Sequence, residues 1–238
     1  MARAEELLAG LIARLIADAH HVAVGAASPI PATACELLRA QGKPLRVTRL
    51  HKRKGNPFSE GSRELFDLAG QGRIDYFFLG GAQLDGEANI NLVRAEGRRF
   101  PGSFGSAYLY YVVPKVILFR LEHSRRTLVE RVDFISAPGT SAANIYRPGG
   151  PVALVTRRCL FAFDRQRRRF ALASVHPGHS VAEVVEHTGF DFDRPPHVPV
   201  TPAPSPETLR LLRTAVAPQL LEVYPQFAAQ VFGAPQSV

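Results

Sequence analysis

The sequence has very few cysteines and no long apolar run. Of its 238 residues only Cys35 and Cys159 are cysteines, too few for the disulfide framework of a small secreted domain. No stretch reaches the ~18 consecutive apolar residues that suggest a membrane-spanning helix. The first 21 residues lack the basic start, apolar middle and small-residue cleavage site of a signal peptide. These absences favour a cytoplasmic protein with reduced thiols.

Acidic residues are outnumbered by basic ones. The 29 lysines and arginines exceed the 21 aspartates and glutamates, which gives a formal net charge of +8. Such a charge suits nucleic acid, an oppositely charged subunit or a phosphate-bearing ligand. The basic residues are scattered over expected turns, however, and no helix-turn-helix, zinc-finger or aromatic-basic RNA-binding motif accompanies them. We therefore expect solvated, arginine-rich loops, and neither nucleic acid nor a membrane as a partner.

Helical and strand patterns alternate over the first 80 residues. The expected order is helix 4–18, strand 20–25, helix 28–42, strand 44–51, helix 62–72 and strand 74–81. The last of these strands is apolar nearly throughout, as is typical of a strand covered on both faces. The alternation predicts an α/β protein with an open, mainly parallel sheet and helices on both faces.

The second half of the chain predicts more strands and two more helices. The expected strands are 115–122, 128–136, 152–164 and 169–176, and a helix follows over 180–189 with Ser180 as its cap. Residues 194–206 form a proline-rich connector to a C-terminal helix, which is capped by Ser205 and has Pro206 in its first turn. There is no internal repeat, and we expect residues 1–238 to form a single domain.

Two glycine turns are the candidate functional elements. In "FFLGGAQLDGEANIN", residues 77–91, a strand runs into Gly80 and Gly81, and the carboxamides of Gln83, Asn89 and Asn91 follow. Bare backbone can approach a ligand closely, and its N–H groups can hold a phosphate, a carboxylate or a developing oxyanion. Ligands of parallel α/β sheets bind at the carboxyl ends of strands, which is where this turn is expected.

The second turn repeats the small-residue pattern with Gly102, Ser103 and Gly105. Neither turn carries the G-x-G-x-x-G fingerprint of dinucleotide-binding proteins or the G-K-[ST] of a P-loop. A loop whose amides satisfy its own backbone is the alternative interpretation of both turns.

Four motifs, read in order, resemble the beta subunit of class I CoA-transferases, in particular that of glutaconate CoA-transferase. They are "FFLGGAQLDGEANIN", "FPGSFGSA", "VERVDFISAPG" and "SVHPGHSVAEVVEHTGFDF", and the resemblance runs from about residue 5 to residue 193. It implies the open α/β CoA-transferase fold, an alpha-type partner subunit in a heterodimer or heterotetramer, and an active site between the two. The substrate would be an acyl-CoA, with no tightly bound cofactor because coenzyme A arrives with the substrate.

In that family a beta-subunit glutamate attacks the thioester, and an acyl-glutamyl anhydride and then a glutamyl-CoA thioester form. The glycine turns matching Gly80-Gly81 and 102–105 would line the acyl-CoA pocket. The chain departs from the family where this glutamate is expected, after the second strand, because His51 and Lys52 stand there. The first available carboxylate is Glu60, which is either the nucleophile or a glutamate at a helix start.

Without a glutamate, the resemblance implies hydrolysis of a carbon–carbon bond in a ring-containing CoA thioester, or decarboxylation of a glutaconyl-type CoA. His51 would then be a candidate general base, with a surface histidine as the alternative. A non-catalytic subunit that only shapes the pocket is a further alternative. His176 and His179, two histidines three residues apart, are poor evidence for a metal site.

Overall fold

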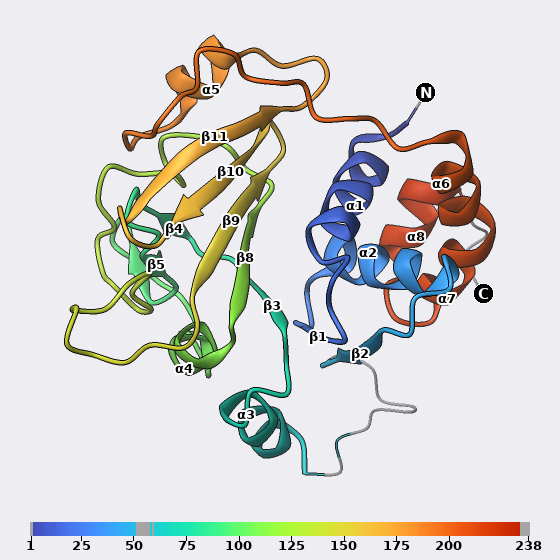
Figure 1. The fold of residues 1–238 in the computed structure, drawn as a ribbon, viewed down its shortest axis with the longest axis horizontal. Helices are drawn as coiled ribbons and strands as arrows, with labels where there is room; N and C mark the ends of the chain where they lie inside the picture. The colour runs from blue at the N-terminus through green and yellow to red at the C-terminus, as the bar shows by residue number, and fades with distance from the viewer. Residues whose placement is uncertain (1, 51–57, 59, 234–238) are drawn as a thin grey trace. The chain divides into compact units, whose positions relative to one another are not determined.

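The computed structural model describes residues 2–50, 58 and 60–233 (Figure 1). Seven strands are hydrogen-bonded in the order β11-β10-β9-β8-β3-β1-β2, and two short hairpins, β4–β5 and β6–β7, stand apart from them. The strands are β1 (His21–Val24), β2 (Arg46–Arg49), β3 (Tyr76–Leu79), β4 (Gln83–Leu84), β5 (Ile90–Asn91), β6 (Arg94–Ala95), β7 (Arg98–Arg99), β8 (Lys115–Arg120), β9 (Pro151–Thr156), β10 (Cys159–Asp164) and β11 (Arg169–Val175).

The helices are α1 (Ala4–Leu15), α2 (Pro29–Ala40), α3 (Ser62–Gly70), α4 (Ser106–Val112), α5 (Val181–His187), α6 (Pro206–Leu211), η1 (Leu212–Val216), α7 (Ala217–Leu221) and α8 (Pro225–Phe232). The alternation expected over the first 80 residues is confirmed, with α1 three residues shorter than expected. The sheet is mixed: β1–β2 and β8–β9 are parallel pairs, whereas β9, β10 and β11 are antiparallel.

The described chain divides into two compact units. One comprises residues 1–61, 74–76 and 202–238, and the other comprises residues 62–73 and 77–201. In the first unit, α1 packs on α2, and α2 also contacts η1 and α7 (Figure 1). The apolar face of α1 buries Leu8 and Ile12 completely, as the three- and four-residue spacing predicts.

The C-terminal helix contains a π-helical segment. The structure confirms the Ser205 cap, whose hydroxyl accepts a hydrogen bond from Thr208 N. The helix then widens into η1, where Ala217 N donates to Leu212 O. Pro218 follows immediately, and its ring and missing N–H cannot fit a regular α-helical ladder, which accounts for a change of winding at this point.

The second unit has a phenylalanine core. Phe161 and Phe170 lie on β10 and β11 with ring centroids 5.8 Å apart, and Phe190 stacks on Phe170 at 5.4 Å. Backbone hydrogen bonds between Leu172 and Asp193, and between Val175 and Pro199, join β11 to the extended segment that follows α5. Part of the proline-rich connector therefore lies along this strand.

Two strand predictions for the second unit are wrong. The expected strand 152–164 is two antiparallel strands, because Arg157 and Arg158 form a turn between β9 and β10. Apolar and polar residues alternate in the segment 128–136 as in a strand. The structure, however, has only two isolated bridges here, Leu84 with Leu128 and Ile90 with Ala137, the residue after the segment. These bridges are made to β4 and β5 themselves and not to a strand of the seven-stranded sheet. Among the described residues, no helix is long and apolar enough to cross a membrane.

The buried carboxylate of Glu6, on α1, allows the stability of the first unit to be tested. The carboxylate is buried and accepts hydrogen bonds from Arg213 Nε at 2.7 Å, Arg213 Nη2 at 2.9 Å and Arg3 N at 2.8 Å. Burial alone would raise the pKa of Glu6, but the hydrogen bonds and positive charges of Arg213 and Arg3 outweigh it and hold the pKa below 4.5. The stabilisation is therefore present above pH 4.5 and is lost as the pH falls through the lower, folded-state pKa.

We expect Glu6→Gln to lower the free energy of unfolding at pH 7 by about 1–2 kcal/mol. Urea unfolding at pH 7 and at pH 3 measures the effect, which should shrink at pH 3. Glu5→Gln, in the same helical turn, is the matched control. Equal losses in the two variants would show that the Arg213 pair does not stabilise this unit.

Candidate functional site

Four of the predicted site residues border one pocket in the second unit. Gly80, Gly81 and Gln83 from the first glycine turn and Gly102 from the second line a cavity of about 460 Å³. The other lining residues are Ala82, Leu92, Ala95, Glu96, Arg98, Phe100, Pro101, Arg120 and Arg126. The two turns therefore meet at one cavity, although they are well separated in the sequence. We call this cavity the glycine pocket.

The glycines at the end of β3 are required by close backbone approach. A Cβ atom on Gly80 would lie 2.8 Å from Phe119 O of β8. On Gly81 it would lie 2.8 Å from both Gln83 O and the Ile90 Cγ2 methyl. Neither glycine has a positive φ, so the constraint at both positions is space and not backbone conformation.

Asn91 and Gln83 face each other across the β4–β5 hairpin. Asn91 Nδ2 donates to Gln83 Oε1 at 2.8 Å and to Arg94 O at 2.6 Å, and Asn91 Oδ1 accepts from Val93 N at 3.1 Å. Gln83 Oε1 also accepts from Asp133 N at 3.0 Å. Asn91 is completely buried and its amide is occupied by these bonds, so Gln83 is the carboxamide that borders the glycine pocket.

Asn89 belongs to a second network, built on Asp85. Asp85 Oδ1 accepts from Asn89 N at 3.0 Å, and Oδ2 accepts from Asn89 Nδ2 at 3.1 Å. Asn89 Oδ1 in turn accepts from Gly139 N at 3.1 Å. Burial raises the pKa of the Asp85 carboxyl, against the opposing effect of these hydrogen bonds. Sequence reasoning did not single out Asp85, although an aspartate followed by glycine is a known turn signal.

In the second glycine turn, one glycine borders the glycine pocket and the other is required by packing. Gly102 has φ +106° and borders the glycine pocket. Gly105 precedes α4, and a Cβ there would collide with the Phe66 ring of α3. Ser103 accepts a hydrogen bond from Ser106 N at 2.8 Å through its carbonyl oxygen. Gly105 and Ser103 thus shape the turn and are not among the residues that border the cavity.

Arginines that the sequence analysis did not select supply the charge of the glycine pocket. Arg120 and Arg126 share one carboxylate, Glu122, at 3.0 Å and 2.8 Å. No described residue accepts a hydrogen bond from the buried Nε atom of Arg120. With Arg98 as the third arginine and Glu96 as the one acidic residue of the lining, the pocket suits an anionic or strongly polarised ligand.

The candidate nucleophile Glu60 and the candidate base His51 are not assigned to the glycine pocket. Glu60 is exposed and lies in a bend just before α3, and it belongs to the first unit, whereas the pocket belongs to the second. His51 lies outside the described residues. The catalytic roles of Glu60 and His51 therefore stay predictions, as do the substrate-binding roles of the glycines and carboxamides.

The contacts of His176, in the turn that also contains His179, stabilise the fold. His176 is buried between Thr201 Oγ1, at 2.8 Å, and Thr156 O, at 3.1 Å. Among the described residues, no group of three histidines, cysteines or acids is placed to hold a metal ion. Cys159 has a partner that the sequence did not reveal, since its sulfur lies 3.6 Å from Thr156 Oγ1. Burial raises the pKa of Cys159 to about 12, so its thiol is protonated at neutral pH.

Residues 45–187 match the Coenzyme A transferase family, and this match covers more than half of the chain. The chain belongs to that family. The B-type subunit of 3-oxoadipate CoA-transferase from Pseudomonas knackmussii is 33% identical over 157 residues, which are 61% of this chain and 60% of that protein. The B-type subunit of glutaconate CoA-transferase from Acidaminococcus fermentans is 30% identical over 153 residues, 59% of this chain and 56% of that protein. The matches thus span less than two thirds of the length of these relatives.

Solved structures show the same fold. A chain of the decarboxylase AibA/AibB superimposes with a TM-score of 0.76 at 27% identity, over 98% of this chain and 100% of that chain. A chain of glutaconate CoA-transferase from Acidaminococcus fermentans gives a TM-score of 0.78 at 22% identity, over 93% and 97% of the two chains. The predicted α/β, CoA-transferase-like fold class and the resemblance to this family are confirmed.

The close approach at Gly80 leads to a prediction. Gly80→Ala places a methyl group against Phe119 O, and we expect it to lower the free energy of unfolding by roughly 1–3 kcal/mol. Gly25→Ala is the matched control, because its Cβ would meet only Ser28 Oγ, at 3.4 Å. Chemical denaturation compares the two. If Gly80→Ala were as stable as Gly25→Ala, close packing would not be the reason for glycine at this position.

The buried histidines predict a pH dependence. Burial lowers the pKa of His176 to about 4, and burial together with the charge of Arg158 lowers the pKa of His123 to about 4. Both are then neutral in the folded chain where they would be protonated in the unfolded one. We expect stability to fall as the pH drops from 6.5 to 4, by roughly 3 kcal/mol for each histidine.

Denaturation midpoints between pH 7 and pH 4 test this expectation. His176→Gln should flatten the profile, whereas substitution of the exposed His197 by glutamine provides the comparison. A profile for His176→Gln as steep as that of the unmodified chain would contradict the assignment.

Proposed function

We propose that this chain is the beta-type subunit of a heteromeric CoA-transferase-like enzyme that acts on an acyl-CoA thioester. The glycine pocket is the observation that supports this most directly. Gly80, Gly81 and Gln83 are among its lining residues, and the two glycines carry no side chain. Backbone N–H groups and a neutral amide are suited to a polarised carbonyl, which gains negative charge when a nucleophile attacks.

The partner is proposed from the relatives. The two CoA-transferase relatives are named as B-type subunits, and AibA/AibB is named as a two-component decarboxylase. An alpha-type subunit in a heterodimer or heterotetramer would complete the site. A cytoplasmic location stays a prediction, in keeping with two buried, unpaired thiols.

Coenzyme A transfer is the reaction we propose first, with Glu60 as its nucleophile. The carboxylate would attack the thioester carbonyl and expel the coenzyme A thiolate, leaving an acyl-glutamyl anhydride. The thiolate would then attack the glutamyl carbonyl and release the acyl group as a free acid. The glutamyl-CoA thioester would finally pass coenzyme A to a second carboxylic acid.

Hydrolysis or decarboxylation of the acyl group is the second candidate. It is favoured by the position of Glu60, directly before α3 and not directly after β2, and by the likeness to a decarboxylase. In that case an acid or base, with His51 as one candidate, would replace the covalent glutamate. A chain that shapes the pocket while its partner carries out the chemistry is the remaining possibility.

Trapping the covalent intermediate separates these reactions. We expect the chain and its partner, incubated with an acyl-CoA and then with borohydride, to carry a reduced glutamyl residue at position 60, found by peptide mass spectrometry. Glu60→Gln should abolish both the adduct and nearly all of the transfer rate, an effect on the order of two or more decades.

The other outcomes are equally informative. Turnover of acyl-CoA without any adduct would reject the transfer mechanism and favour hydrolysis or decarboxylation. Full activity in both Glu60→Gln and His51→Ala would assign the chemistry to the partner. No acyl-CoA turnover or binding by the assembled enzyme would contradict the proposed function altogether.

A further inference from the structure

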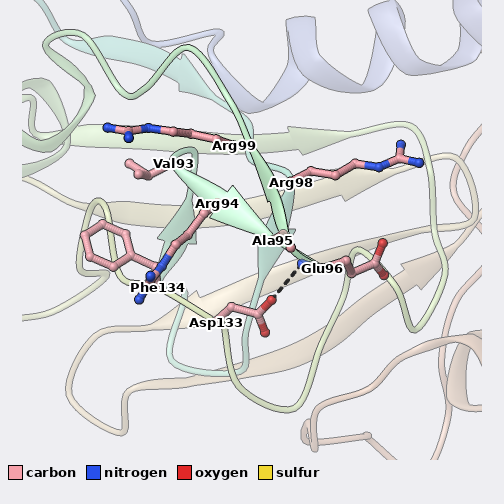
Figure 2. Close-up of a pocket in the computed structure, with 9 residues that line it drawn as sticks. Val93, Arg94, Ala95, Glu96, Arg98, Arg99, Asp133 and Phe134 are labelled. Carbon is pink, nitrogen blue, oxygen red and sulfur yellow. Dashed lines mark hydrogen bonds between the residues drawn. The ribbon is translucent and has the colours of Figure 1, made fainter.

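The short hairpin formed by β6 and β7 borders two pockets. One is the glycine pocket, and the other is a cavity of about 780 Å³ that the hairpin forms with Asp133 and Phe134 (Figure 2). We call this second cavity the hairpin pocket. Ala95, Glu96 and Arg98 border both cavities. A ligand long enough to pass the hairpin can therefore occupy both.

The hairpin register places two like charges side by side. Arg94 lies directly opposite Arg99, and Ala95 lies opposite Arg98. Successive residues of a strand point to opposite faces, so Arg94 and Arg99 share one face and Arg98 lies on the other. Figure 2 shows this division, with the Arg94 and Arg99 side chains leaving the hairpin on the side of Phe134 and Arg98 leaving it on the opposite side.

Glu96 and Asp133 also line the hairpin pocket, but neither is within ion-pair distance of the two arginines. Like charges directly opposite each other destabilise a strand pair, and no described carboxylate forms an ion pair with Arg94 or Arg99. Both side chains are exposed. The Arg94 guanidinium lies over the Phe134 ring, 5.7 Å from its centroid. Two arginines beside an aromatic ring suit a ligand with phosphate groups and a flat ring.

Hydrogen bonds that lead back to Asn91 and Gln83 hold the hairpin in place. Asn91 binds the backbone of Arg94 through Nδ2 to O at 2.6 Å and through Oδ1 to N at 3.3 Å. At the turn, Glu96 N donates to Asp133 Oδ2 at 3.0 Å, and Asp133 N donates to Gln83 Oε1. The same two carboxamides thus support the glycine pocket and position the arginines of the hairpin.

We propose that Arg94 and Arg99 bind the phosphate groups at the nucleotide end of coenzyme A in the hairpin pocket. The Arg94–Phe134 pair supplies a flat surface on which the adenine ring stacks. The pantetheine arm passes Ala95 and Arg98, and the thioester reaches the glycine pocket. The assignment rests on the proposed function, because it divides one acyl-CoA between the two cavities.

Titration calorimetry with three probes tests the assignment, on the full chain alone and with its partner subunit. The probes are coenzyme A, adenosine 3′,5′-bisphosphate as the nucleotide half, and pantetheine as the thiol half. We expect Arg94→Gln and Arg99→Gln each to raise the Kd of coenzyme A and of the bisphosphate about tenfold, with pantetheine unchanged. Arg157→Gln removes one exposed charge from the turn between β9 and β10 and is the control.

Arg94→Lys and Arg99→Lys keep the charge and guard against a loss of folding. They should retain more affinity for the bisphosphate than the glutamine variants. Coenzyme A that binds the unmodified chain and both glutamine variants equally would overturn the assignment and leave the proposed function standing. A matching loss of pantetheine affinity would also overturn it. If the unmodified chain, alone and paired, bound neither coenzyme A nor acyl-CoA, the assignment and the proposed function would fall together.

Discussion

The buried hydrogen bond between the Asn91 and Gln83 side chains, 2.8 Å long, is the interaction on which the pocket region depends. It fixes the β4–β5 hairpin directly after Gly80 and Gly81, the two glycines that follow β3. From there Asn91 holds Arg94, and Gln83 holds Asp133, which holds Glu96. A buried amide left without its partner is costly, so these groups form a single arrangement. The glycine pocket and the arginine hairpin are two edges of that arrangement.

Asp85 extends the arrangement to the other side of the same loop. Its carboxylate organises residues 87–89, and Tyr110 of α4 donates to Ala88 O at 2.8 Å. Ala88 is held at φ +61°, a conformation that a non-glycine residue adopts only when its surroundings require it. The segment from Gly80 to Asn91 is therefore held by hydrogen bonds along its length, which suits a binding site that presents its backbone to a ligand.

The sequence predicted the fold through patterns that are local and repeated. Helical spacing in 4–18 and buried strands at 21–24 and 76–79 report burial directly, so these elements were found. The segment 128–136 misled because its neighbours are the short strands β4 and β5, through Leu84 and Ile90, and not a strand of the seven-stranded sheet. Periodicity reports which side of a segment is buried, and it does not identify the partner that buries it.

For the site, the glycine turns could be recognised, because a glycine indicates either a close approach, as at Gly80 and Gly81, or a positive φ, as at Gly102. The roles of the carboxamides could not be separated in the same way. Asn89, Asn91 and Gln83 look equivalent in the sequence, yet only Gln83 borders the glycine pocket. Asp85, Arg120 and the Arg94–Arg99 pair were missed because their significance depends on register and on partners distant in the chain, which a single sequence does not reveal.

The distribution of charge gives the two cavities different chemistry. At the glycine pocket, Glu122 pairs with both Arg120 and Arg126 and offsets part of their charge, while Gly80, Gly81 and Gln83 are neutral lining residues. Neutral, hydrogen-bonding lining residues suit a carbonyl that acquires charge only during reaction. On the far face of the hairpin, Arg94 and Arg99 have no such carboxylate among the described residues, which suits a group that carries its charge permanently. On the proposed function, a thioester and its nucleotide differ in this same respect, and the net charge of +8 reflects ligand chemistry at the hairpin as well as solvated loops elsewhere.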